Sequence, residues 1–485
     1  MRGDARARGF DEMLGANGEG AGVRAPYGQW RDWFEAQDPA RLRSKATEAE
    51  ALFRRTGITF AVYGQAEAAE RLIPFDVVPR VLGADEWAAL ERGIAQRVRA
   101  LNLFLHDIYH GAECVRAGVV PEALIRDNAA LLPEMMGVEP PGGVYTHIVG
   151  VDLVRTGPGE FVVLEDNART PSGVSYMIEN RETMLRMFPD LFARVPVRPV
   201  SDYPTLLRRS LAAVPPPAFR GAGKPTVAVL TPGIHNSAYF EHSFLADAMG
   251  VELVEASDLS VEGGRVCMRT VTGPEAVDVL YRRVDDAFLD PLSFRPDSML
   301  GVPGIFEVYR AGGITLANAP GTGISDDKAL YSYMPAIVRH FTGEEPILQN
   351  VETHRCAEPD ALRYTLDHLD ELVVKEVHGS GGYGMLVGPA ASRAEIEAFR
   401  AKLIAKPDGY IAQPTLALST VPILTEKGLA PRHVDLRPFA LVSDVNGPDG
   451  VRIVPGGLTR VAMTEGSLVV NSSQGGGTKD TWVLE

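Results

Sequence analysis

The chain has 485 residues, which is too long for one hydrophobic core, so we expect about two to four domains. Its content of 45% hydrophobic and 23% charged residues is typical of a globular protein. The formal net charge of −15, without a long block of either sign, argues against nucleic acid as the main partner. The cysteines Cys114, Cys267 and Cys356 are far apart, which fits a reducing cytoplasm better than a disulfide framework.

The chain begins with a polar stretch that precedes a helical region. Residues 1–25 are charged and rich in glycine, so we expect them to be mobile and not to form a signal peptide. From 26 to 139, apolar residues recur at three- and four-residue spacings, which predicts helices with Asp85 as an N-cap and Gly111 as a stop. No apolar run is long enough to cross a bilayer, so we expect a cytoplasmic protein without a membrane partner.

The next two stretches predict strands. Within 140–212, VYTHIVGVDLVRT and EFVVLED are two strands joined by the turn Gly157-Pro158-Gly159, and a helix follows through SYMIENRETMLRMF. Residues 213–225, AVPPPAFRGAGKP, are the expected linker. The segment 226–320 begins with a strand, a loop, a helix and a second strand, which predicts a parallel, Rossmann-like sheet. The loop lacks the G-x-G-x-x-G fingerprint of dinucleotide binding. The chain is therefore expected to have an α/β fold.

The stretch GEFVVLEDNARTPSG carries a candidate metal site. An apolar run predicts a buried strand that ends in Glu165, Asp166 and Asn167. Because alternate strand residues point to the same face, Glu165 and Asn167 could offer oxygen atoms to one hard cation, and Asp166 should face the other way. The alternative is an ordinary solvated strand end.

The segment 321–485 carries a candidate phosphate site. In ELVVKEVHGSGGYGMLVGP, a strand delivers Lys375 and leads into a hairpin whose tip could approach phosphates closely. The tip consists of Gly379, Ser380, Gly381, Gly382, Tyr383 and Gly384. The alternative, a long turn, needs fewer than the four glycines found in these six residues.

Other polar residues of the segment strengthen that interpretation. Lys328 is expected at the start of a helix capped by Ser325 or Asp326, and Gln413 ends a strand whose backbone could face an adenine edge. Arg437 and Arg460 are expected on or beside strands. Two lysines, a glycine-rich hairpin and two arginines in one domain favour a nucleoside triphosphate site.

The order Lys328, Lys375, glycine-rich hairpin, Gln413 and Arg460 resembles the nucleotide-binding half of ATP-grasp enzymes. The resemblance implies that the lysines contact phosphates, that the hairpin closes over ATP and that the strand ending at Gln413 meets adenine. In the usual order the magnesium ligands follow near the C-terminus. Here the matching set, Asp152, Glu165 and Asn167, comes much earlier, which implies a circularly permuted fold that uses ATP and one or two Mg²⁺ ions.

The run Glu165-Asp166-Asn167-Ala168-Arg169-Thr170-Pro171 is similar to the metal loop of glutathionylspermidine synthase. The stretches NSAYFEHSFLADAMGVELVE and VVNSSQGGGTKDTWVL resemble bacterial circularly permuted ATP-grasp type 2 proteins, and this resemblance covers residues 70–485. It implies a Rossmann-like pre-ATP-grasp domain at 226–320, metal ligands in 140–212 and nucleotide binding in 321–485. The sequence departs from glutathionylspermidine synthase at Gly150, where that enzyme has a catalytic arginine, and it has no amidase domain. Arg169 is one candidate for the missing charge.

The resemblance implies an ADP-forming ligase that activates a carboxylate as an acylphosphate and joins it to an amine. Its substrates would be a small-molecule or peptide carboxylate and an amine. Other hypotheses are a kinase-like phosphotransferase, or a nucleotide-binding scaffold that docks a protein partner through the helical N-terminal region. The residues expected to act on the transferring group are Arg169, Arg437 and Arg460, and those expected to contact substrate are Ser172, Arg282 and Asp285.

Overall fold

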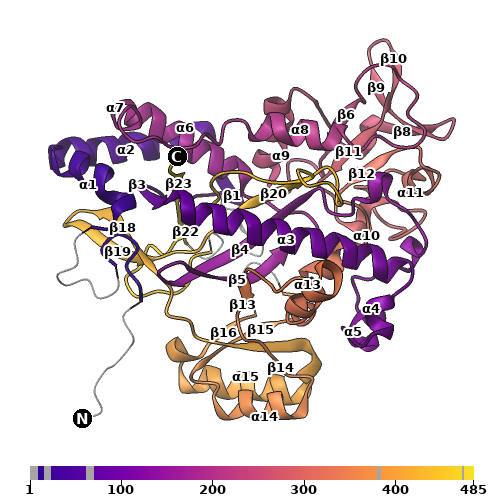
Figure 1. Cartoon of the computed structure of the whole chain (residues 1–485). Helices are drawn as coiled ribbons and strands as arrows, with labels where there is room; N and C mark the ends of the chain where they lie inside the picture. Colours follow the sequence, from indigo (N-terminus) through magenta and orange to yellow (C-terminus); the bar gives the residue numbers. More distant parts are fainter. Residues whose placement is uncertain (1–8, 16–22, 62–69, 380–383, 472–474) are drawn as a thin grey trace.

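The computed structural model describes residues 9–15, 23–61, 70–379, 384–471 and 475–485, and it has a mixed α/β fold of several sheets with helices packed around them (Figure 1). None of the described helices is long and apolar enough to span a bilayer. The α-helices are α1 (Gly28–Glu35), α2 (Pro39–Thr56), α3 (Ala84–Tyr109), α4 (Glu113–Arg116), α5 (Glu122–Arg126), α6 (Val174–Met187), α7 (Pro189–Phe192), α8 (Tyr203–Ala212), α9 (Tyr239–Met249), α10 (Asp286–Leu289), α11 (Ile305–Arg310), α12 (Lys328–Tyr331), α13 (Met334–Thr342), α14 (Pro359–Asp367) and α15 (Arg393–Ala405).

A five-stranded sheet in the order β13-β5-β4-β20-β21 occupies the middle of the molecule (Figure 1). Its strands are β4 (Ile148–Gly157), β5 (Glu160–Asn167), β13 (Gln349–Asn350), β20 (Phe439–Val442) and β21 (Val451–Ile453). The expected hairpin of β4 and β5 is confirmed, and β20 pairs antiparallel with β4 on its other side. Segments far apart in sequence therefore share one sheet, and helix α3 packs against this sheet at β21.

A second sheet joins an early strand to a late one. It has the order β22-β23-β3 and consists of β3 (Phe75–Leu82), β22 (Thr459–Val461) and β23 (Gly477–Val483). Strands β3 and β23 run parallel, with Thr478 paired to Phe75. Lys479 of β23 is buried, and its ammonium lies 2.7 Å from the carboxylate of Asp76 on β3, so an ion pair links these two strands of the sheet.

The Rossmann-like unit is confirmed as a parallel sheet in the order β12-β11-β6-β7. Its strands are β6 (Val227–Leu230), β7 (Glu252–Val254), β11 (Val279–Arg282) and β12 (Thr315–Ala317), and α9 connects β6 to β7. A small antiparallel sheet of β8 (Leu259–Glu262), β9 (Arg265–Thr270) and β10 (Gly273–Val277) follows β7. Residues 213–225 connect α8 to β6 without a helix or strand.

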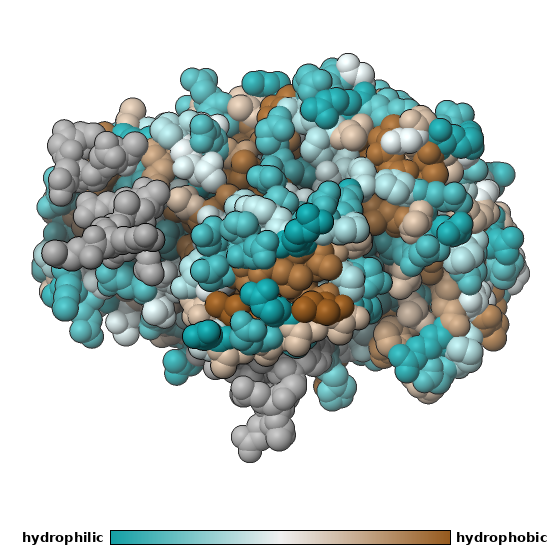
Figure 2. Space-filling view, turned by 90° about the horizontal axis from the view of Figure 1, so that it is seen from below, coloured by the Kyte–Doolittle hydropathy of each residue, from teal (hydrophilic) through white to brown (hydrophobic). Residues whose placement is uncertain are grey.

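Strands and helices of residues 354–414 form a projecting lobe at the bottom of Figure 1. Its antiparallel sheet has the order β14-β17-β15-β16, and α14 and α15 pack together beside it. Its strands are β14 (His354–Arg355), β15 (Leu372–Glu376), β16 (Leu386–Val387) and β17 (Tyr410–Pro414). A separate small core, which includes Val374 and Leu403, lies between the sheet and the helices. Seen from below, the molecule presents a largely hydrophilic face with groups of hydrophobic residues within it (Figure 2).

Two details of the N-terminal region add to the expectations from the sequence. Residues 9–15 are the first that the structure describes, and among them Glu12 is buried with its carboxylate 2.5 Å from the Arg80 guanidinium. Helix α3 is capped at Gly83 rather than Asp85, which lies in its first turn.

The remaining strands form two hairpins, β1 (Thr59–Ala61) with β2 (Glu70–Leu72), and β18 (Thr420–Thr425) with β19 (Gly428–His433).

Candidate active site

The hairpin of β4 and β5 brings the three expected metal ligands to one face. Asp152 lies directly opposite Glu165, and Gly150 lies opposite Asn167, so these side chains share a face of the sheet. Asp166 points to the opposite face, where it is buried against Arg97. The strand register expected from the sequence is thus confirmed.

Two arginines meet on the Asp152 carboxylate. Nε and Nη2 of Arg437 both donate to it, the second over 2.7 Å, and Nη2 of Arg460 donates over 2.7 Å. Burial alone would raise the pKa of Asp152, but the charges of Arg437 and Arg460 outweigh it and hold that pKa well below its usual range. Asp152 is therefore an anion whose two oxygen atoms are both already bonded, which makes it a less available metal ligand than the sequence suggested.

Gly150 leaves the space in which Arg437 lies. A Cβ atom at position 150 would stand 3.1 Å from Cδ and 3.3 Å from Cγ of Arg437. The side chain of Arg437 thus crosses the hairpin over this glycine and reaches Asp152, with Nη2 at 3.9 Å from the Glu165 carboxylate. The guanidinium of Arg437 thus lies beside position 150, where the sequence itself has no charge.

Both expected phosphate-binding lysines reach the same face. Lys328, the first residue of α12, has its ammonium 3.5 Å from the Glu165 carboxylate and donates to the carbonyl oxygen of Gly379 over 2.6 Å. Lys375 on β15 donates to Oε1 of Gln413 over 2.9 Å. Burial lowers the pKa of Lys375, and Lys328 lowers it further, while Glu165 opposes the shift. The helix that begins at Lys328 is capped by Asp327, not by Ser325 or Asp326.

Asp326 is a site residue that sequence reasoning assigned only to helix capping. Its carboxylate accepts a hydrogen bond from the Ala168 amide over 2.7 Å, just beyond the end of β5. Burial raises the pKa of Asp326 to about 7, with a further contribution from Glu165, although the Ala168 amide and Arg169 oppose the shift. Two carboxyl groups thus repel each other at the end of the hairpin, an arrangement that a cation relieves.

The donor set at this end fits a hard cation. Glu165 and Asp326 supply carboxylate oxygens, and Asn167 supplies an amide oxygen on the same side as Glu165. The Nδ2 atom of Asn167 is buried and has no hydrogen-bond partner among the described residues, so no bond to its amide nitrogen holds this side chain in place. We regard Glu165, Asn167 and Asp326 as residues suited to Mg²⁺, with Asp152 beside them.

The described ends of the glycine-rich tip, Gly379 and Gly384, lie close to Lys328 and Glu376. The carbonyl of Gly379 receives the Lys328 bond, and Gly384 has a φ of +69°, a backbone conformation that favours glycine. A Cβ atom at Gly384 would also come within 2.7 Å of a Glu376 carboxylate oxygen. Ser380, Gly381, Gly382 and Tyr383 lie outside the described residues.

The loop after β5 is held by Arg283, a residue that the sequence pattern did not single out from its neighbour. Arg283 is buried and donates to the Pro171 carbonyl over 2.7 Å and to Oγ of Ser172 over 3.1 Å. Arg282 is buried too, but its guanidinium bonds to three backbone carbonyls and pairs with Asp286 at 2.6 Å. The expected substrate contact by Arg282 stays a prediction, and in this structure these partners already occupy its guanidinium.

Arg169 lies at the outer edge of the same loop. Its Nε is 3.5 Å from the Asp285 carboxylate, and both side chains are partly exposed. Ser172 joins this edge to the arginines of the hairpin, because its carbonyl accepts from Nη1 of Arg437 over 3.2 Å and its Oγ accepts from Arg283. The structure thus places Arg169, Ser172 and Asp285 on the solvent side of the site.

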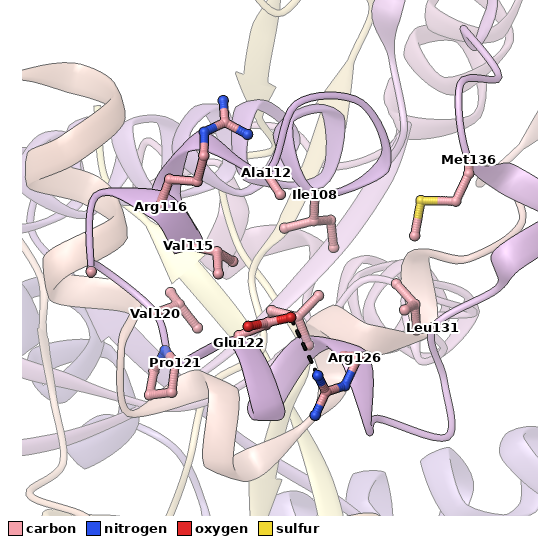
Figure 3. Close-up of a pocket in the computed structure, with 12 residues that line it drawn as sticks. Ile108, Ala112, Val115, Arg116, Val120, Pro121, Glu122, Arg126, Leu131 and Met136 are labelled. Atoms are coloured by element: carbon pink, nitrogen blue, oxygen red, sulfur yellow. Dashed lines mark hydrogen bonds and ion pairs between the residues drawn. The ribbon is translucent and has the colours of Figure 1, made fainter.

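A hollow of about 590 Å³ lies between the end of α3 and the short helices α4 and α5 (Figure 3). Its lining is mostly apolar, and Arg126 at its rim pairs with Glu122 at 3.3 Å, as the dashed line shows. The Asn128 side chain, just beyond α5, donates to Asp327 over 2.9 Å, so this segment supports the start of α12. The hollow therefore borders the support of Lys328 and does not contain the hairpin residues.

Comparison with known proteins gives consistent results. The family model described as circularly permuted ATP-grasp type 2 matches residues 79–462. An uncharacterised protein of Synechocystis sp. is 50% identical over 98% of this chain and 97% of its own length, and one of Mycobacterium tuberculosis is 51% identical over 99% and 85%. A Frankia alni protein named "Putative glutamate--cysteine ligase 2-3" is 42% identical over 98% of this chain, which spans 54% of that longer protein.

One solved structure has a similar fold. It is the apo form of a glutathione synthetase-like effector from Globodera pallida, with a TM-score of 0.58 over 92% of this chain and 98% of that one. The sequence identity is 10%, so the similarity concerns the fold alone.

Proposed function

Because this chain belongs to the circularly permuted ATP-grasp type 2 family, we propose that it is an ATP-dependent ligase that joins a carboxylate to an amine and releases ADP. The observation that carries the proposal is the convergence of cations on the hairpin face. Lys328 and Arg437 lie 3.5 and 3.9 Å from the Glu165 carboxylate, and Arg460 shares Asp152 with Arg437. Such a concentration of positive charge suits the polyphosphate of ATP and the charge that develops as its terminal phosphoryl group moves.

The proposed reaction has two steps. First, a carboxylate oxygen attacks the γ-phosphorus of ATP, which gives an acylphosphate and ADP. The amine nitrogen then attacks the acyl carbon, loses a proton and expels inorganic phosphate, which leaves an amide. The protein's contribution is to hold the reactants and to neutralise charge in a closed site.

Each residue has a role in this proposal. Lys328 and Lys375 bind phosphate oxygens. The backbone at Gln413, on the strand β17 that pairs with the strand of Lys375, faces adenine. Gly379 and Gly384, the described ends of the glycine-rich tip, would lie next to the phosphates. Arg437 and Arg460 stabilise the transferring phosphoryl group, and their hydrogen bonds to Asp152 hold the two arginines in place.

Substrate and metal ion would occupy neighbouring parts of the hairpin. Mg²⁺, when bound, supplies further charge neutralisation for the phosphates. Glu165 and Asn167 would hold it together with Asp326 or Asp152. Arg169 and Ser172, at the solvent side, would contact the acceptor carboxylate or amine.

The test screens many candidate substrates at once. The protein is incubated with Mg-ATP and pooled small acids, peptides and amines, and mass spectrometry searches for a product one water lighter than the sum of two components. ADP should appear in equal amount, and Glu165→Gln should abolish both signals. AMP in place of ADP, or an accumulating phosphorylated acid whose formation ignores the amine, would overturn the ligase assignment.

The Frankia name is consistent with carboxylate–amine ligation, but it belongs to a protein nearly twice as long as the matched segment. Glutamate and cysteine are therefore two components to include in the pool. They are not an assignment for this chain.

A further inference from the structure

Two histidines and a glutamate meet at the C-terminal end of α3, apart from the hairpin site. Nε2 of His106 lies 3.0 Å from Oε2 of Glu139, and Nε2 of His110 lies 3.3 Å from the same oxygen. The two imidazole rings are stacked, with centroids 4.2 Å apart and planes 10° apart. All three side chains reach solvent, so a small ion has access to them.

The hydrogen bond made by Nδ1 of His110 determines which nitrogen of the ring carries the proton. Its Nδ1 lies 2.9 Å from the carbonyl oxygen of His106, one turn earlier in the helix. A carbonyl only accepts hydrogen bonds, so Nδ1 carries the proton and Nε2 of the neutral ring carries a lone pair. That lone pair faces a carboxylate oxygen, which is also an acceptor, so a cation, either a proton or a metal ion, between the two atoms turns this contact into an attraction.

Two of the three ligand-to-ligand spacings match a tetrahedral metal site. Bonds of about 2.0–2.1 Å to zinc place neighbouring tetrahedral ligands about 3.3 Å apart. The two nitrogen-to-oxygen distances, 3.0 and 3.3 Å, are close to that value, and the three ligand atoms all lie within 4.8 Å of one another. The Nδ1–H bond of His110 to a backbone carbonyl is the outer contact that usually orients a metal-binding histidine.

We propose that His106, His110 and Glu139 bind one divalent transition-metal ion, with zinc as the fitting occupant and water in the fourth position. Two imidazoles and one carboxylate suit zinc, cobalt or nickel, whereas Mg²⁺ prefers oxygen ligands and would select the hairpin. The ion connects the end of α3 to the segment that leads into β4, because Glu139 precedes that strand. This inference is independent of the proposed ligase activity.

The experiment titrates the metal-free protein with zinc chloride in a calorimeter. One equivalent should bind, and Co²⁺ in its place should show the visible absorption of a tetrahedral site. His110→Gln and Glu139→Gln should each weaken zinc binding at least tenfold, since each removes one of three ligands. Melting curves in a chelator should be unchanged for both variants because the side chains are exposed.

His368→Gln is the matched control. The Nδ1 atom of His368 also lies near the carbonyl of the residue four positions earlier, Tyr364, at 2.8 Å, but among the described residues no carboxylate completes a metal-ligand group around it. This variant should bind zinc as the parent protein does. Absence of a stoichiometric zinc site, or zinc binding that persists unchanged in His110→Gln and Glu139→Gln, would overturn the proposal.

Discussion

Asp166→Asn should destabilise the protein, in contrast to Glu165→Gln one residue earlier. The Asp166 carboxylate is buried and accepts from Nε and Nη2 of Arg97 over 2.7 and 2.6 Å, and Nη1 of Arg97 donates to Asn350 on β13 over 2.7 Å. Removing one partner of a buried ion pair costs about 3–5 kcal/mol of unfolding free energy. Asparagine keeps one acceptor oxygen but turns its amide hydrogens toward the guanidinium, so we expect about 3 kcal/mol, the lower end of that range.

Hydrogen exchange of β5 measures this cost directly. A loss of about 3 kcal/mol should speed exchange of its protected amides about a hundredfold, whereas Glu165→Gln should leave exchange unchanged and abolish Mg-dependent ADP release. Arg97→Gln, alone and with Asp166→Asn, completes a double-mutant cycle. The reasoning is refuted if the coupling energy is near zero, or if Asp166→Asn exchanges like the parent protein.

Three further outcomes are expected. Lys375→Met should abolish ATP binding in a titration and yet raise the urea midpoint at pH 7. Burial lowers the pKa of Lys375, so below about pH 10.4 the charged ammonium lowers the free energy of unfolding. A lower urea midpoint would contradict this. Burial raises the pKa of Asp326 to about 7, so this carboxyl group contributes stability that is complete below about pH 4 and is lost as the pH rises through 7. Asp326→Asn should therefore make the melting temperature less dependent on pH between pH 5 and 8. A pH dependence equal to that of the parent protein would count against the raised pKa. Gly150→Ala should lower kcat at least tenfold with intact folding, because the new methyl group forces Arg437 to shift by a few tenths of an ångström beside Asp152. Parent-like kinetics would remove Arg437 from the proposed role.

Local patterns predicted much of the fold and the orientation of the hairpin residues. The two-residue period of a strand placed Glu165 and Asn167 on one face and Asp166 on the other, and the register bears this out. The same rule could not choose between Arg282 and Arg283, because adjacent strand residues take opposite faces and the sequence does not say which face is the core. The Rossmann-like unit was predictable because its elements are consecutive in the chain.

Contacts between segments that are distant in the sequence could not be predicted from local patterns. Nothing near Asp152 in sequence indicates that Arg437 and Arg460 bond to both of its oxygens, since both arginines come from segments near the other end of the chain. Asp326 looked like a helix cap because a carboxylate before a helix usually is one, and its neighbour Asp327 takes that place. Its proximity to Glu165 depends on how the turn Thr322–Asp326, just before α12, packs against β5.

The pairing of β3 with β23 bears on how the chain is made. As synthesis proceeds from the N-terminus, β3 emerges with its fully buried side chains exposed, and its parallel partner is completed only when residues 477–483 have been added. The edge of β4 that pairs with β20 likewise stays unpaired until residues 439–442 have been synthesised. The Rossmann-like unit, by contrast, can form while it is being synthesised. We therefore expect nascent chains that stop before β20 to aggregate or to recruit chaperones, because they leave two apolar strand edges open.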